Sequence, residues 1–350
     1  MTEPQAVTTD VLETWANDRK GPVALTMRQK LLPVEGEGAV IYPPTYATAE
    51  GYVIDRLSDG TRVAQIDSVG AQANRMEPLF KEAPHKDLVP QITITLGNEK
   101  TVSILDAGHR LGDALVRSTR DLAGKAQEAF AAFAERGDAA PIARLAPTSL
   151  VFGAWDSRGE GAKLPRLVNS VIRAWDVDPL HRAATYIPPV DYAEMEVFND
   201  TTKKSDLDLL SSAGFRHAPS QGLGGIIARG GIFRDVTLNL VALRHLDGDN
   251  GAALRRYVLG LALVAATEPQ DGFLRQGCLL TPDPDIPAQW TSVARSGERT
   301  PVALTADTAQ REASDAAKAF GVGSGGEYTF DKKQARDVRN NARRTREKAE

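Results

Sequence analysis

The sequence predicts an α+β fold in which helices pack on one face of a sheet. Segments with alternating apolar residues and segments with helical periodicity are both present, and they do not follow a regular βαβ order. The chain has 350 residues, which is enough to bury a sizeable core. An RRM-like (ferredoxin-like) core with large insertions fits this mixture.

The first elements are two strands followed by a helix. In residues 22–34, PVALTMRQKLLPV, apolar side chains alternate as in a half-buried strand, and residues 61–67, TRVAQID, form a second candidate strand. Ser68 is a good N-cap for the SVGAQANRM stretch that follows. In that helix Gln72 and Arg75 fall on the same face and form a short polar stripe.

The middle of the chain predicts a hairpin, a long helix and a strand-to-helix turn. Residues 91–105 read as a hairpin about Gly97-Asn98, and the alanine-rich helix after it ends at Gly137. TSLVF, residues 148–152, is typical of a short strand. Pro165 suits the first turn of a helix with apolar residues on one side, namely Leu164, Val168, Val171 and Trp175.

Periodicity is weak between residues 176 and 219, which indicates a long loop or an extended insertion. A glycine-rich stretch then leads into an expected strand at 232–243, a buried helix at 251–267 and another strand at 272–282. We therefore divide the chain into a palm with insertions, 1–282, and a C-terminal extension, 283–350, with a basic tail at 331–348.

Composition places the chain among soluble globular proteins, with 42% hydrophobic and 25% charged residues. The net charge is −4, but the last twenty residues carry +4, which leaves −8 on the other 330. Cys278 is the single cysteine, so an internal disulfide is excluded and a cytoplasmic location is expected. No signal peptide or membrane-spanning stretch is expected.

Enzyme motifs fail on their context. GAWDSRGEGAK lacks the ending of a phosphate-binding P-loop because Leu164 follows Lys163, and the five histidines have no metal-ligand spacing. Three carboxylates at expected strand ends, Asp67, Asp106 and Asp156, would suit metal-assisted phosphodiester cleavage if they converged. The alternative is that Asp67 and Asp106 cap the elements that follow them.

Four polar clusters fit a single-stranded nucleic acid, which requires cations for phosphates and close approach of the backbone. In the third and fourth clusters, glycines would let main-chain N–H groups reach a phosphate. The predicted RNA-binding residues are Gln72, Asn74 and Arg75; His109 and Arg110; Arg158, Lys163 and Arg166; and Gly222, Gly224 and Gly225 with Arg229.

The motifs DSVGAQANRMEPLF, ILDAGHRLGDALVRS and FGAWDSRGEGAKLPRLVNSVI, in this order, resemble the backbone subunit of type I-U, now I-G, CRISPR surveillance complexes (Cascade), a branch of the RAMP superfamily. The resemblance covers most of residues 23–280. In the family, the Q-A-N-R motif often follows Ser, where this chain has Ala71. A hydroxyl contact at that position is therefore not expected.

The resemblance implies an RRM-like palm, a protruding thumb at 91–105 or 176–219, and several copies stacked along one CRISPR RNA. It implies no cofactor or metal and no catalysis by this subunit; the alternative is a metal-dependent RAMP ribonuclease that cuts target RNA. The implied partners are the CRISPR RNA, the target DNA strand paired to it, other copies of the chain, a large subunit and a Cas-five or Cas-six type end-cap subunit. The basic tail matches no motif and reads as a disordered or partner-contacting arm.

Overall fold

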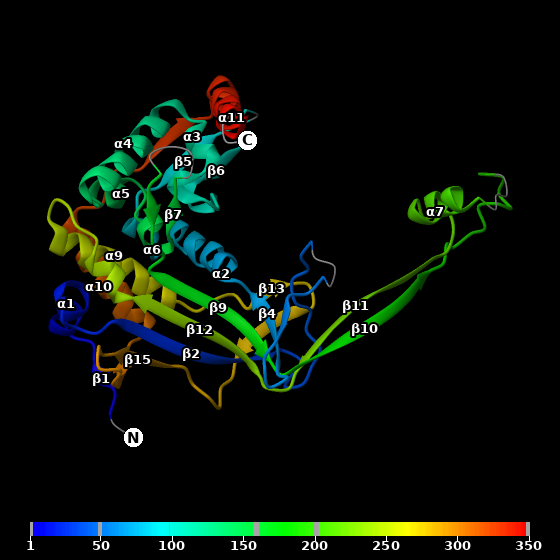
Figure 1. Cartoon of the computed structure of the whole chain (residues 1–350), viewed down its shortest axis with the longest axis horizontal. Coiled ribbons are helices and arrows are strands. Elements are labelled where there is room, and N and C mark those ends of the chain that lie inside the picture. Colours follow the sequence, from blue (N-terminus) through cyan, green and yellow to red (C-terminus); the bar gives the residue numbers. More distant parts are fainter. Residues whose placement is uncertain (1–2, 48–50, 98, 157–160, 199–202, 348–350) are drawn as a thin grey trace.

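The computed structural model describes residues 3–47, 51–97, 99–156, 161–198 and 203–347. It has the α+β fold that the sequence predicts. A large sheet runs through the molecule, helices cover one of its faces, and a long hairpin extends away from the body (Figure 1).

The main sheet has ten strands, and its centre is antiparallel. β2 (Ala24–Pro33), β12 (Ile232–Asn239) and β9 (Val168–Trp175) lie side by side at its middle. From one edge to the other, the order is β1 (Gln5–Ala6), β16 (Arg299–Ala303), β15 (Gln289–Val293), β2, β12, β9, β4 (Arg62–Asp67) and β3 (Ile54–Arg56). β14 (Cys278–Pro282) also pairs with β2, and β13 (Phe273–Arg275) pairs with β14.

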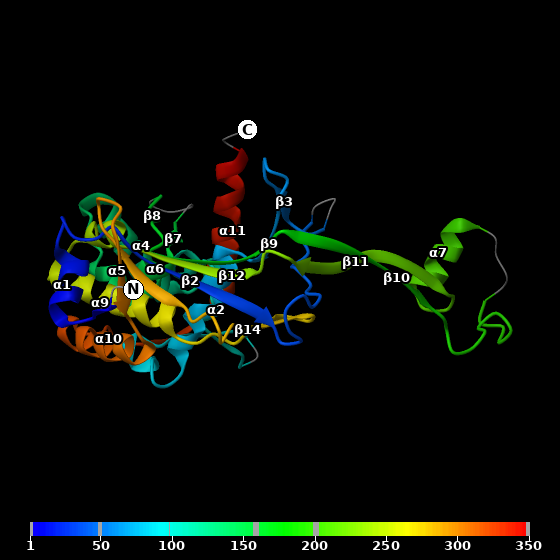
Figure 2. The ribbon, with the colours of Figure 1, turned by 90° about the horizontal axis from the view of Figure 1, so that it is seen from below.

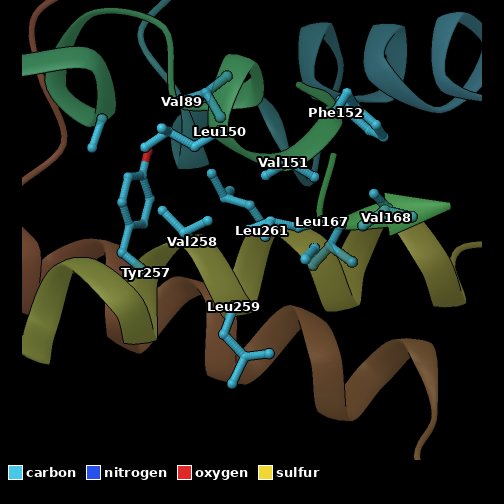
Figure 3. Close-up of a cluster of buried hydrophobic side chains, with 14 of the residues drawn as sticks. Val89, Leu150, Val151, Phe152, Leu167, Val168, Tyr257, Val258, Leu259 and Leu261 are labelled. Carbon is cyan, nitrogen blue, oxygen red and sulfur yellow. The ribbon is translucent and has the colours of Figure 1, made fainter. Parts of the chain in front are cut away.

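The central helix is α9 (Gly251–Thr267), which is apolar on nearly every side because it lies between two layers. Leu259 points toward α10 (Ala306–Phe320), whereas Val258 and Leu261 point toward the opposite layer (Figure 3). The Tyr257 hydroxyl donates to the Leu88 carbonyl at 2.7 Å, and burial raises its pKa. The helices α1 (Thr9–Asn17), α2 (Val69–Met76) and α8 (Leu240–Arg244) complete this cover.

A second group of elements adjoins α9 and the sheet. It contains the helices α3 (Ala114–Arg117), α4 (Arg120–Arg136), α5 (Ala140–Leu145) and α6 (Thr148–Phe152), the 3₁₀ helices Glu77–Lys81, Lys86–Leu88, Ile104–Asp106 and Arg110–Gly112, and a small sheet of β17 (Gly326–Thr329), β5 (Ile92–Thr95) and β6 (Thr101–Ser103). Helix α11 (Lys332–Glu347) packs against α3.

Two hairpins leave the body. The short one joins β7 (Ala154–Trp155) to β8 (Lys163–Leu164). The long one pairs β10 (Val177–Tyr186) with β11 (Ala218–Ala228) and carries α7 (Lys204–Ser212) at its far end (Figure 1). The region expected to be a loop or insertion is therefore a projecting hairpin.

Several expected elements are confirmed. Ser68 caps α2 by accepting a hydrogen bond from Ala71 N at 3.2 Å, and α4 ends at Gly137, whose φ is +69°. The strands β2 and β4 and the helix α9 lie where the sequence predicts them. The strand expected at 232–243 ends earlier, because β12 stops at Asn239 and residues 240–243 belong to α8. The single strand expected at 272–282 is instead the antiparallel pair of β13 and β14. β5 and β6 form the expected hairpin, although Asn98 of its turn lies outside the described residues.

Two predictions about the middle of the chain are wrong. Residues 148–152 form the buried helix α6, and the residues after Pro165 form the strand β9. In β9 the alternate residues Val168, Ser170 and Ile172 are buried because their face lies against helices, and Val171 on the other face is buried as well. The GAWDSRGEGAK segment therefore follows a helix and precedes a strand. The sequence predicts the opposite, a strand before it and a helix after it.

The segment after residue 282 is built into the same body. β15 pairs with β2, α10 packs along α9, and β17 pairs with β5. The basic tail forms α11 over residues 332–347. No helix in the described part of the chain is both long and apolar enough to cross a membrane.

The contact between α9 and α10 depends on Gly260. A Cβ atom there would lie 2.7 Å from the Cα of Ala313, so Gly260→Ala must push the helices apart. We expect the free energy of unfolding to fall by about 1–3 kcal/mol, measured by urea denaturation. Gly124 of α4 is the control, because a Cβ there meets no atom within 4 Å and Gly124→Ala should stabilise by about 0.5–1 kcal/mol. Equal effects of the two substitutions would contradict this assignment.

Candidate nucleic-acid interface

Gln72, the first residue of the Q-A-N-R motif, is fully buried between α2 and the sheet. Its Nε2 donates to Asp67 Oδ2 at 2.8 Å, and its Oε1 accepts from Ser170 Oγ at 2.7 Å. Arg234 Nε in turn donates to Ser170 Oγ at 3.1 Å. Gln72 thus joins α2 to β9 and β12 and is not accessible to RNA in this structure.

Arg75 lies next to the same carboxylate. Its Nε donates to Asp67 Oδ2 at 3.0 Å, and its Nη2 donates to the Leu274 carbonyl at 2.8 Å. Arg275 Nη2 approaches the other oxygen, Asp67 Oδ1, at 3.4 Å. Asp67 is 1% exposed, so three donors, two from α2 and one from β13, meet at one buried carboxylate.

Arg110 and Asn74 do come together. Arg110 is 4% exposed, and its Nη2 lies 3.5 Å from Asn74 Oδ1. Its Nε lies 2.8 Å from Glu77 Oε2, and burial lowers the pKa of Arg110. Arg110 also has φ +53°, a left-handed conformation that costs a non-glycine residue about 1–2 kcal/mol.

Arg166 contacts the main chain of Phe152, whose ring lies next to Arg110. Its Nε donates to the Phe152 carbonyl at 2.9 Å, while the Arg110 guanidinium lies 5.1 Å from the centre of the Phe152 ring. Arg110 Nη1 donates to the next carbonyl, of Gly153, at 3.3 Å. Burial lowers the pKa of Arg166. The structure therefore gathers Asn74, Arg110 and Arg166 where α6 leads into β7.

The β7–β8 hairpin presents an exposed aromatic residue and a cation. Trp155 is 61% exposed, and the Lys163 ammonium lies 5.8 Å from the centre of its ring. Arg158 lies outside the described residues. The neighbour of Arg110, His109, has an exposed side chain whose Nδ1 lies 3.5 Å from Asp113 Oδ2. An indole beside an ammonium is a combination that proteins use to stack a base and contact its phosphate.

The predicted glycine cradle lies at the root of the β10–β11 hairpin, where glycine is needed for packing. A Cβ on Gly224 would lie 2.6 Å from the His181 backbone, and Gly225 has φ +91°. Gly222 pairs with Arg182 in β10. Arg229, just after β11, lies 3.1 Å from Asp178. RNA contact at these four residues stays a prediction.

The open face of the main sheet carries candidate residues that sequence reasoning missed. Arg234 points to the face of the sheet that α9 covers, where it donates to the Ala266 carbonyl. Because side chains alternate along a strand, Arg28, Arg173 and Phe233 lie on the opposite face. The Arg28 guanidinium lies 4.1 Å from the Phe233 ring centre and 5.8 Å from that of Trp175. Period-two alternation in the three central strands was the signal that could have found them.

Figure 2 shows α9 and α10 on one side of β2 and β12, and the β7–β8 hairpin with α11 on the other. The β7–β8 hairpin, to which Trp155 and Lys163 belong, therefore lies on the side of the sheet that its open face turns to. We call this surface the open-face patch; it comprises Arg28, Trp155, Lys163, Arg173, Trp175 and Phe233.

The three carboxylates proposed for metal chemistry have separate partners. Asp67 binds Arg75 and Arg275, Asp106 lies 2.7 Å from Lys81, and Asp156 lies 3.9 Å from Arg117. Within the described ranges, no three His, Cys, Asp or Glu side chains gather as metal ligands would.

A mixed fold with exposed arginines and aromatic rings on an open sheet is typical of nucleic-acid-binding proteins. Residues 25–179 match the model of a family described as CRISPR-associated protein GSU0053. The matched part is less than half of the 350-residue chain, and it contains the Q-A-N-R, G-H-R and W-D-S-R motifs. The match supports a CRISPR-associated protein with a role in CRISPR defence. No curated protein matches the chain.

The Asp67 cluster has a structural role that can be measured. Asp67→Asn would leave Arg75 and Arg275 without their buried carboxylate, and we expect the free energy of unfolding to fall by about 3–5 kcal/mol. The control is Asp106→Asn, which breaks a half-exposed pair with Lys81 and should cost under about 1 kcal/mol. Urea denaturation measures both. A loss at Asp67 no larger than the loss at Asp106 would argue against the cluster.

Glu77 predicts a pH dependence of stability. Burial raises its pKa from 4.5 to about 7, although Arg110 acts in the opposite direction. The folded state therefore binds this proton more tightly than the unfolded state, so the stabilisation present below pH 4.5 is lost as the pH rises through 7. Between these limits, we expect the free energy of unfolding to fall by about 1–3 kcal/mol more in the wild type than in Glu77→Gln. Parallel pH profiles would rule this out.

Proposed function

We propose that this chain is a non-catalytic, CRISPR RNA-binding backbone subunit of a type I-U/I-G Cascade complex in antiviral defence. The observation that carries the proposal is the match of residues 25–179 to a CRISPR-associated family. The motifs in which the sequence resembles Cascade backbone subunits lie inside that segment. The proposed palm is RRM-like, with the main sheet as its centre.

The open-face patch supports RNA as the ligand. Trp155, Trp175 and Phe233 offer rings on which bases can stack, and stacking tolerates any sequence because every base has a π-face. Lys163 and Arg173 supply exposed cations for phosphates. A guide changes with every target, so a subunit that holds it must bind without reading its sequence.

The long hairpin is the better thumb candidate of the two. Residues 91–105 pack into the small sheet with β17, whereas β10 and β11 extend from the body. Ile187 and Leu209 near its far end are exposed apolar residues, which favours a protein partner there. Stacking of copies along one guide, pairing of target DNA with that guide, and contacts to a large subunit and a Cas-five or Cas-six type end-cap subunit complete the proposal.

Binding of single-stranded RNA should be strong at low salt and independent of sequence. With about four phosphate contacts per subunit, affinity should fall roughly fifty-fold between 50 and 200 mM salt. Arg173→Ala combined with Lys163→Ala should reduce the slope of log affinity against log salt by about 1.4, because two of the exposed cations proposed to contact phosphates are removed. Fluorescence anisotropy with two unrelated RNAs measures this.

Arg136→Ala is the matched control, since Arg136 is exposed on α4 and its side chain pairs only with the neighbouring Glu135 among the described residues. A flat salt response, or equal losses in the control, would argue against the RNA site. Magnesium-dependent cleavage of complementary RNA at regular spacing, abolished by Asp106→Ala or Asp156→Ala, would contradict the non-catalytic role.

A further inference from the structure

Helix α11 is anchored at its start and stands away from the sheet (Figure 2). Asp331 caps it by accepting hydrogen bonds from Lys333 N at 2.8 Å and Gln334 N at 3.1 Å. The same carboxylate pairs with Arg120 of α4 at 2.9 Å. The helix rises on the same side of the sheet as the β7–β8 hairpin.

One side of α11 is basic. Lys332, Arg336 and Arg339 follow one another at spacings of four and three residues, which places them on one stripe of the helix. All three are exposed. The sequence repeats the same spacing with basic residues at 343 and 346.

None of these three cations pairs with a carboxylate in the described part of the chain, although Arg339 Nη2 donates to the Asn340 side-chain oxygen at 3.1 Å. Within the part of the chain that the structure describes, neither Lys332 nor Arg336 nor Arg339 lies within ion-pair distance of a carboxylate, whereas Arg62 pairs with Asp178 at 2.7 Å and Arg256 with two glutamates. A protein with net charge −4 that leaves a row of cations unneutralised has them free for an external anion.

The composition of α11 narrows the kind of ligand. Residues 332–347 contain no aromatic residue, and Ala335 and Val338 are half-buried. A protein interface usually needs buried aromatic or aliphatic anchors, a membrane surface needs an apolar face, and a single strand needs rings for stacking. A double helix needs none of these, because its bases are already stacked and its phosphates face outward.

We propose that the basic stripe of α11 binds double-stranded DNA through its phosphates, without sequence specificity. A helix of 16 residues is about 24 Å long, and its diameter of about 10–12 Å matches the major groove of B-DNA. The groove of double-stranded RNA is too narrow to admit it. The site is separate from the open-face patch and does not depend on guide RNA.

The test compares two triple variants of the full chain. Lys332→Glu/Arg336→Glu/Arg339→Glu reverses the stripe, and Arg19→Glu/Lys20→Glu/Lys318→Glu makes the same charge change at exposed positions elsewhere. Anisotropy is measured over a salt series with a DNA duplex of about 20 base pairs, in two sequences, and with a single-stranded RNA of about 12 nucleotides.

We expect the stripe variant to bind both duplexes about tenfold or more weakly, with a salt slope smaller by about 2–3, because up to three phosphate contacts are lost. Its RNA affinity should stay within about twofold of wild type, which also reports that it is folded. The control variant should retain both affinities.

Three outcomes would overturn the proposal. Wild-type protein that binds RNA but no duplex refutes the DNA site and leaves the proposed RNA function intact. Equal losses of RNA and duplex binding would assign α11 to the guide site. Unchanged duplex binding, with the stripe variant losing only its association with other subunits, would make α11 a protein-binding helix.

Discussion

The meeting of Gln72, Arg75 and Arg275 at the buried Asp67 carboxylate is the interaction on which the packing of α2 and β13 against the main sheet depends. Asp67 ends β4, Gln72 and Arg75 belong to α2, and Arg275 belongs to β13, so one side chain fixes the relative positions of three elements. Through Gln72 and Ser170, the network extends to Arg234 on β12, whose pKa burial lowers to about 10. Because polar groups at such depth are costly unless each is bonded, the geometry of all of them is tightly specified.

The two faces of the main sheet have different roles, since one packs against helices and the other carries exposed side chains. Along β12, the buried residues Arg234, Val236 and Leu238 face the helices, and their neighbours Phe233, Asp235 and Thr237 face the other way. A strand can serve both purposes only because its side chains alternate, which explains why the same short segment contributes to the network around Asp67 and to the open-face patch.

Much of the fold could be predicted from the sequence, because α9, α4 and β2 have strong periodicity and their ends carry recognisable caps. The errors at α6 and β9 have one cause: short apolar runs such as TSLVF fit a strand and a buried helix equally well, so only tertiary packing decides. In the β10–β11 hairpin, β10 had no alternation to detect, because its residues are exposed on both faces beyond the root of the hairpin. Site residues were harder still. Gln72 and Arg75 are polar and look like surface residues in the sequence. The sequence around them does not indicate that Asp67 is buried beside them, because that burial arises from tertiary packing.

The root of the long hairpin determines where its far end lies. Asp178 pairs there with both Arg62 and Arg229, and Gly224 and Gly225 let the strands approach neighbouring backbone closely. A ten-residue strand such as β10 extends about 33 Å, so a change of about 5° at the root displaces the far end by about 3 Å. A few contacts at the root of the hairpin thus determine the position of its far end. If that end contacted other copies of the chain, the spacing between copies would depend on these root contacts, which lie far from the contacting surfaces.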